Sequence, residues 1–211
     1  MNEKEVNQMN EQILRSVYRP LVPIVFPPYR GRQMRYHAFD LAEPRMPEDF
    51  EDYLEPVRAL CAAAEARTGE AYLTVDEKVI TAGMSQRRPR PHVDGCFRRT
   101  GDQMQWGGGG AWLHYCNDVG ASPIGRMAVI VAASVPGCRA WKGIFNGRPA
   151  KDGDLSHIAD QLGAGEVLPA NVGYLLSPDC VHESMTFERE TLRTFIRIAL
   201  PVSFAEASEW D

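Results

Sequence analysis

The chain has 211 residues, of which 44% are hydrophobic and 24% are charged, and these are ordinary values for a globular protein with one well-buried core. Its formal net charge of -5 argues against sequence-independent binding of nucleic acid by the whole surface. Five scattered cysteines without a Cys-x-x-Cys pair favour reduced thiols in a cytoplasmic protein over a disulfide scaffold or a zinc site. The most continuous apolar run, Met127 to Ala133, is far too short to cross a bilayer, so no membrane partner is expected.

The first third of the chain has helical and extended patterns. Apolar residues at helical spacing over residues 2–18 predict an amphipathic N-terminal helix. Four prolines between residues 20 and 28 then predict an extended connector that cannot sustain a helix. An apolar stripe over residues 47–68, which stops at Gly69, predicts a second amphipathic helix. We therefore expect residues 1–69 to brace a larger core.

After residue 70 the apolar period changes from about 3.6 towards 2, and short β-type runs alternate with turn residues. The predicted strands cover residues 71–75, 78–84, 90–97, 111–117, 126–134, 138–145, 172–177, 181–187 and 191–200. One short helix over residues 155–162 interrupts them. This pattern predicts a mainly β protein, a double-stranded β-helix (jelly roll) braced by N-terminal α-helices. We expect one domain over residues 1–211, with the β core at 70–202 and a C-terminal tail at 203–211.

One short motif has the chemistry of a metal site. His92 and Asp94 are separated by one residue, so on a strand both side chains point to the same face. His182 follows a distant apolar run and can supply a third ligand. Two imidazoles and one carboxylate on one face of an octahedron are typical of non-haem Fe(II) oxygenases. The alternative is that His92 is a structural histidine, that Asp94 belongs to a turn before Gly95, and that His182 lies on an exposed turn.

The last predicted strand has two chemically different faces. One face is formed by alternating residues that suit packing against a helix: Leu192, Thr194, Ile196, Ile198 and Leu200. The opposite face has Arg193, Phe195 and Arg197, and is expected to look into the barrel. An arginine buried there needs an anionic partner. Either that partner is a bound carboxylate, or the arginines pair across a hairpin with Glu183, Glu188 or Glu190.

Three segments together resemble the Fe(II)/2-oxoglutarate-dependent dioxygenase superfamily, whose pattern is His-x-Asp, a distal His and a downstream Arg: Pro91-His-Val-Asp-Gly95, Gly173-Tyr-Leu-Leu-Ser-Pro-Asp-Cys-Val-His-Glu-Ser184 and Thr191-Leu-Arg-Thr-Phe-Ile-Arg197. The resemblance covers roughly residues 77–200. It implies that His92, Asp94 and His182 bind Fe(II). It also implies that Arg193 binds the distal carboxylate of 2-oxoglutarate, with Arg197 as the second candidate. Phe195 stands where the superfamily often has a hydroxyl residue, which leaves the second contact to the co-substrate unassigned.

The resemblance also implies an activity. With Fe(II), 2-oxoglutarate and O2, a member of the superfamily hydroxylates a C–H bond and releases succinate and CO2. The substrate can be a small molecule, a peptide or a nucleobase. A basic cluster around the motif, namely Arg87, Arg88, Arg90, Arg98 and Arg99, favours an anionic substrate at the mouth of the site. The alternative is that these arginines are solvated strand ends.

Two other classes of function remain open from the sequence. The first is a non-catalytic jelly-roll module, such as a structural or assembly subunit. The second is a cupin-type metalloenzyme that does not use 2-oxoglutarate. Against the second, the chain lacks the closely spaced His-x-His and the following Glu that cupins usually have, although Asp94 could replace one ligand.

Overall fold

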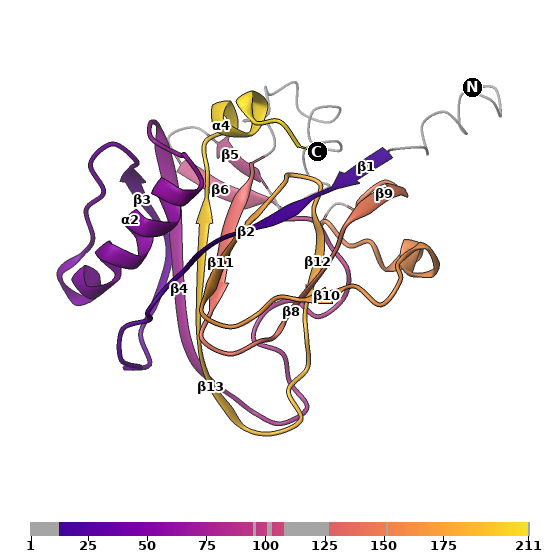
Figure 1. The fold of residues 1–211 in the computed structure, drawn as a ribbon, viewed down its shortest axis with the longest axis horizontal. Coiled ribbons are helices and arrows are strands. Elements are labelled where there is room, and N and C mark those ends of the chain that lie inside the picture. Colours follow the sequence, from indigo (N-terminus) through magenta and orange to yellow (C-terminus); the bar gives the residue numbers. More distant parts are fainter. Residues whose placement is uncertain (1–12, 95, 101–102, 108–126, 151, 211) are drawn as a thin grey trace.

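The computed structural model describes residues 13–94, 96–100, 103–107, 127–150 and 152–210, with the backbone alone at 96–100 and 103–107. Its main element is a six-stranded antiparallel sheet in the order β2-β11-β7-β13-β4-β3 (Figure 1). The strands are β2 (Tyr18–Pro23), β3 (Gln33–Asp40), β4 (Glu70–Ile80), β7 (Val129–Ala133), β11 (Val172–Leu176) and β13 (Thr191–Ala199). Neighbours in this sheet are far apart in sequence, so the sheet joins both ends of the chain.

Three smaller antiparallel sheets accompany it. Strands β10 (Glu166–Val167), β8 (Cys138–Trp141) and β12 (Val181–Ser184) form one of them, in that order. The other two are the pairs β1 (Ile13–Ser16) with β9 (Gly143–Asn146), and β5 (Cys96–Thr100) with β6 (Gln103–Gly107). Because β12 is an edge strand of its sheet, its free side can accept another segment of the chain, and the segment before β5 occupies it.

The helices lie in different parts of the molecule, with α2 (Leu54–Ala63) on one face of the large sheet (Figure 1). The 3₁₀ helix η1 (Glu48–Tyr53) runs directly into α2, which confirms the helix predicted over residues 47–68. Its stripe of Val57, Leu60 and Cys61 packs in one hydrophobic cluster with apolar residues of β4, β7 and β13. The remaining helices are η2 (Ser156–Gln161), which matches the short helix predicted at 155–162, and α4 (Val202–Ala207), which falls in the predicted tail.

The opposite face of the large sheet packs against the β10-β8-β12 sheet. A second hydrophobic cluster there combines residues of β7, β11 and β13 with Ala140 of β8. Figure 1 shows the resulting arrangement, with α2 on one side of the large sheet and β8, β10 and β12 on the other. Strand β13 alternates as predicted, because Ile196 and Ile198 join the cluster with α2 and Phe195 joins the second cluster. The mainly β class is confirmed, while the double-stranded β-helix stays a prediction.

The structure corrects three local predictions. Residues 13–16 and 18–23 form β1 and β2, so the helix predicted over residues 2–18 is wrong in that part, and residues 1–12 lie outside the described residues. The two strands predicted at 71–75 and 78–84 are one continuous strand, β4, which ends at Ile80. Helix α4 also forms where only a tail was predicted, so the helices are not confined to the N-terminal part. The strand predicted at 111–117 lies outside the described residues.

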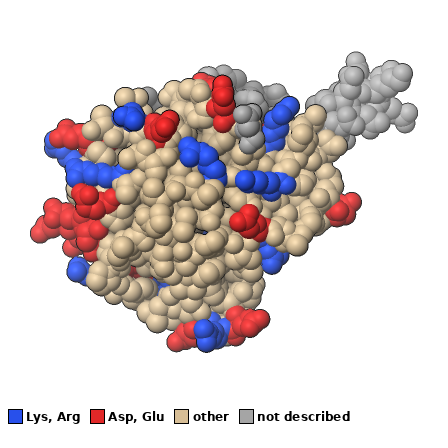
Figure 2. Space-filling model, in the orientation of Figure 1, with Lys and Arg blue, Asp and Glu red and all other residues tan. Residues whose placement is uncertain are grey.

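Surface charge on the viewed face is mixed. Figure 2 shows basic side chains dispersed among acidic ones, and they gather in no single large patch. No helix among the described residues is long and apolar enough to span a membrane.

Candidate metal centre

His92 and His182 are joined through their backbones. The His92 N–H donates to the His182 carbonyl at 2.9 Å, and the His182 N–H donates to the His92 carbonyl at 3.0 Å. His182 lies on β12 as predicted, whereas His92 belongs to an isolated bridge and not to the strand predicted over residues 90–97. Pro89 and Pro91 explain the difference, because proline has no N–H to donate to a ladder. The two-bond pair nevertheless fixes the two imidazoles opposite each other.

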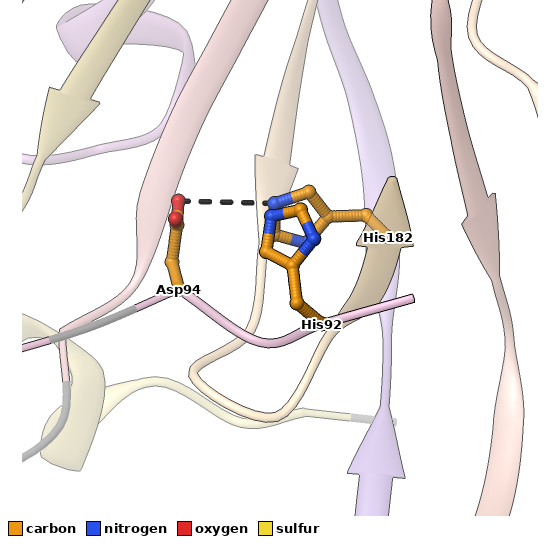
Figure 3. Close-up of side chains that lie close together, drawn as sticks. All are labelled: His92, Asp94 and His182. Atoms are coloured by element: carbon orange, nitrogen blue, oxygen red, sulfur yellow. Dashed lines mark ion pairs between the residues drawn. The ribbon is translucent and has the colours of Figure 1, made fainter. Parts of the chain in front are cut away.

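The side chains of His92, Asp94 and His182 converge (Figure 3). The two imidazole centroids are 4.4 Å apart, and His182 Nε2 lies 3.9 Å from Asp94 Oδ2. One ligand atom from each residue lies within 4.8 Å of the other two. Val93 points the other way and is fully buried in a third hydrophobic cluster with Leu155 and Val181. The predicted alternation of His92 and Asp94 against Val93 therefore holds even without a regular strand.

Both histidines have one ring nitrogen engaged by a backbone carbonyl. His92 Nδ1 lies 2.7 Å from the Arg90 carbonyl, and His182 Nδ1 lies 3.0 Å from the Cys180 carbonyl. A carbonyl only accepts, so each Nδ1 must carry a proton and donate it. Burial, together with the neighbouring His182 and Arg88, lowers the pKa of His92 to about 3. A neutral imidazole with its proton on Nδ1 presents a lone pair at Nε2, which is the form that binds a metal.

Asp94 is a buried carboxylate held by an arginine. Burial by itself would raise its pKa, but Arg197 and the two histidines outweigh burial and hold the pKa well below the usual range. Arg197 Nη1 donates to Asp94 Oδ1 at 3.3 Å. Asp94 Oδ2 is buried and accepts no hydrogen bond from the described residues. An ionised oxygen aimed at two imidazoles and lacking a donor fits the ligand set of a divalent cation.

The three side chains form part of the wall of a cavity of about 460 Å³, as bounded by the described residues. Six cationic side chains line it: Arg35, Lys78, Arg87, Arg88, Arg193 and Arg197. Of the acidic side chains that the structure describes, three do so, namely Asp94, Asp152 and Glu183. The cavity is thus suited to anions. Arg98 and Arg99 belong to β5, whose side chains lie outside the description.

Arg193 and Arg197 both reach this cavity from β13, as the sequence predicted, but their partners differ. Arg193 is 1% exposed, its Nε donates to the Val135 carbonyl at 2.9 Å, and its Nη1 donates to the side chain of Gln86. Burial lowers the pKa of Arg193 to about 10. Among the described residues no acidic side chain forms an ion pair with Arg193, whereas Arg197 pairs with Asp94.

The hairpin pairing considered from the sequence is not formed. Glu183 pairs with Arg139 at 3.2 Å, and the described residues contain no ion pair from Glu188 or Glu190 to either arginine of β13. The idea that His182 is an exposed turn residue is also wrong, because it is buried on β12.

Sequence reasoning missed several residues of the cavity wall. Gln86 positions Arg193, and Tyr36 lines the cavity beside Arg197. Gln86 immediately precedes Arg87, the first residue of the basic cluster, and this position could have indicated from the sequence that Gln86 lies at the site. No sequence signal indicates Tyr36, because a break in the register of β3 between Met34 and His37 turns its side chain towards the cavity.

Comparison with protein-family models, with curated proteins and with solved structures gave no match. What is established about function is therefore local. A mainly β chain brings His92, Asp94 and His182 together in a group that could hold a metal ion.

Proposed function

We propose that this chain is an Fe(II)/2-oxoglutarate-dependent oxygenase that hydroxylates a C–H bond of its substrate and releases succinate and CO2. One observation carries the proposal: a His-Asp-His group and a buried arginine without an acidic partner among the described residues line the same cavity. The first feature suits Fe(II), and the second suits a dicarboxylate co-substrate. The resemblance of the three sequence segments to the Fe(II)/2-oxoglutarate-dependent dioxygenase superfamily also supports the proposal.

The hydrogen bonds of the histidines and Asp94 suit the binding of a divalent cation. His92 and His182 keep their protons on Nδ1 by donating to the Arg90 and Cys180 carbonyls, which leaves each Nε2 free to bind. Asp94 stays ionised because Arg197 contacts Oδ1, and this contact also fixes the orientation of the carboxylate. Arg197 thus acts as a positioning residue for the proposed iron ligand. Bound Fe(II) supplies the oxidative chemistry, in which O2 and 2-oxoglutarate are consumed together.

Arg193 is the better candidate for binding the distal carboxylate of 2-oxoglutarate. Arg197 already contacts a carboxylate, whereas a buried Arg193 without one is energetically costly. The hydrogen bonds to Val135 and Gln86 fix the plane of the Arg193 guanidinium, and rings of Phe187 and Phe195 lie 5.7 and 5.6 Å from it. A planar guanidinium held in this way can form a two-bond contact with a carboxylate.

The test is spectroscopic first and catalytic second. Fe(II) and 2-oxoglutarate are added to the chain without oxygen, and the metal-to-ligand charge-transfer band is recorded; oxygen is then admitted and succinate is assayed. We expect a band and succinate from the native chain. Asp94→Ala should show no band at any iron concentration. Arg193→Gln should still show the band, but only at a higher 2-oxoglutarate concentration than the native chain needs. That pattern separates metal binding from co-substrate binding.

The same experiment separates the other two classes of function. A chain that binds a divalent metal but gives neither band nor succinate with 2-oxoglutarate is a metalloprotein of another kind, such as the cupin-type enzyme. A chain that binds no metal at all is the non-catalytic β module. If Arg197→Gln and not Arg193→Gln weakens 2-oxoglutarate binding, then the roles of the two arginines are exchanged.

A further inference from the structure

Two adjacent arginines reach the cavity from a segment that is fixed to the strand carrying His182. The Ser184 N–H on β12 donates to the Arg88 carbonyl at 3.0 Å, and the Arg87 N–H donates to Ser184 Oγ at 3.3 Å. Ser184 is two residues from His182 on the same strand. The guanidinium groups of Arg87 and Arg88 are therefore held near the proposed metal centre by backbone pairing, and both line its cavity.

Both arginines are half-buried, and each forms only a long ion pair with a carboxylate, while Arg88 Nη1 also donates a hydrogen bond to the Asp152 carbonyl. Arg87 Nη1 lies 3.9 Å from Asp76 Oδ2, and Arg88 Nη1 lies 3.9 Å from Asp152 Oδ2. Their side chains are 28% and 30% exposed. Burial lowers the pKa of each arginine, and neighbouring Arg197 lowers that of Arg87 further. An anion in hydrogen-bond contact would compensate for this loss of hydration.

The proposed function gives Arg87 and Arg88 no part in binding Fe(II) or 2-oxoglutarate. Asp94 is the partner of Arg197, and the proposed function gives Arg193 the distal carboxylate of 2-oxoglutarate. Asp76 lies outside the lining but pairs with Lys78 and Arg87, so it is counted with the three acidic side chains of the lining. The six cationic side chains together with the iron charge still exceed what these four carboxylates and one dicarboxylate neutralise. A second anion is needed, and the substrate is the molecule that must enter the same cavity.

The neighbouring wall is suited to an organic molecule. Tyr36, Val131 and Phe195 line the cavity together with the arginines. Tyr36 has a φ of +55°, which is uncommon for an aromatic residue, and it lies where the register of β3 breaks. Breaks of this kind turn a side chain towards a site. A cavity of about 460 Å³ is also in the range of small-molecule sites.

We propose that the substrate is a small organic anion, a carboxylate or a phosphate ester, whose charged group is bound by Arg87 and Arg88 while its organic body lies against Tyr36. This inference rests on the proposed function and names the substrate class of the same site. It also gives a role to the basic cluster that precedes His92 in the sequence.

The test uses matched probes on the full chain with Fe(II) and 2-oxoglutarate, without oxygen. Phenyl phosphate, benzoate and the neutral compound benzyl alcohol are titrated by calorimetry, while the charge-transfer band reports occupancy of the metal and co-substrate sites. We expect at least one anion to bind about tenfold or more tightly than benzyl alcohol. The tighter of the two anions distinguishes a phosphate ester from a carboxylate.

Variants then assign the binding to the two arginines. Arg87→Gln and Arg88→Gln should each weaken anion binding about tenfold or more and keep the charge-transfer band. Arg58→Gln, the same change on the outer side of α2, should leave anion binding unchanged and serves as the matched control. Retention of the band shows that a variant is folded around its site.

The outcomes separate the two proposals. Absence of the band in the native chain refutes the proposed function, whatever the probes do. If the band is present, three results overturn the proposed substrate class. They are equal binding of benzyl alcohol and the anions, binding of neither anion, and undiminished anion binding in both variants. A weakened response to 2-oxoglutarate in Arg87→Gln, without loss of probe binding, also overturns it, because Arg87 would then hold the co-substrate.

Discussion

The contact between Asp94 and Arg197 should be energetically strong even without a metal. The two groups are 3.3 Å apart, and their side chains are only 11% and 6% exposed. Two unit charges at that distance attract by about 5 kcal/mol at an effective dielectric constant of ~20. Removing one partner also leaves the other charge buried, which costs about 3–5 kcal/mol in known cases. We therefore expect Asp94→Asn to destabilise the metal-free chain by about 3 kcal/mol.

A double-mutant cycle measures this coupling directly. Asp94→Asn, Arg197→Met and the double variant are unfolded in urea with a chelator present, and circular dichroism gives each free energy of unfolding. The double variant should be more stable than the sum of the two single effects predicts, by about 2 kcal/mol or more. The exposed pair Glu55 and Arg58, 3.1 Å apart on one helix, is the control and should couple by only about 0.5 kcal/mol or less.

One result would refute the reasoning. If Asp94→Asn and Arg197→Met are additive within about 0.5 kcal/mol, the two groups do not act on each other in the folded chain. Arg197 would then not position the proposed ligand. It would also be as free as Arg193 to bind the co-substrate carboxylate.

Three further predictions concern the metal, pH and packing. A divalent metal at 100 times its dissociation constant should stabilise the chain by about 2.7 kcal/mol and raise the melting temperature by about 5–11 °C; His182→Ala should abolish this rise in a thermal scan, and His37→Ala should retain it. Burial opposes ionisation of Glu77, but hydrogen bonds from a tyrosine hydroxyl and two backbone N–H groups outweigh it and lower its pKa. A carboxyl whose pKa is lowered by folding stabilises the fold at pH values above its unfolded pKa of 4.5. Glu77→Gln should therefore lower the free energy of unfolding by about 2 kcal/mol at pH 7, and by less as the pH falls through the folded pKa. Urea titrations at several pH values measure this difference. Gly173→Ala should cost about 1–3 kcal/mol because a new Cβ would lie 2.1 Å from Leu60 Cδ2, and if adding Leu60→Ala does not relieve part of that cost, the predicted contact is wrong.

The sequence alone predicted the features that depend on short-range alternation. On β13 the residues facing the helix and those facing the cavity were separated correctly, because successive side chains of a strand point to opposite faces. The spacing of His92 and Asp94 placed both side chains on one side for the same reason. The helix at 48–63 followed from an apolar stripe of period 3.6. Each of these is a property of a few neighbouring residues.

Features that depend on distant partners required the tertiary structure. Ile13 and Leu14 suit a helix or a strand, and the pairing of β1 with β9, some 130 residues later, makes residues 13–16 a strand. The contact of Arg197 with Asp94 joins residues 103 positions apart, and that of Arg193 with Gln86 joins residues 107 positions apart. The sequence identified Arg193 and Arg197 as candidates, but it could not show which of them contacts a carboxylate of the chain itself. That choice is made by strand register, which depends on pairing across the whole sheet and not on any local pattern.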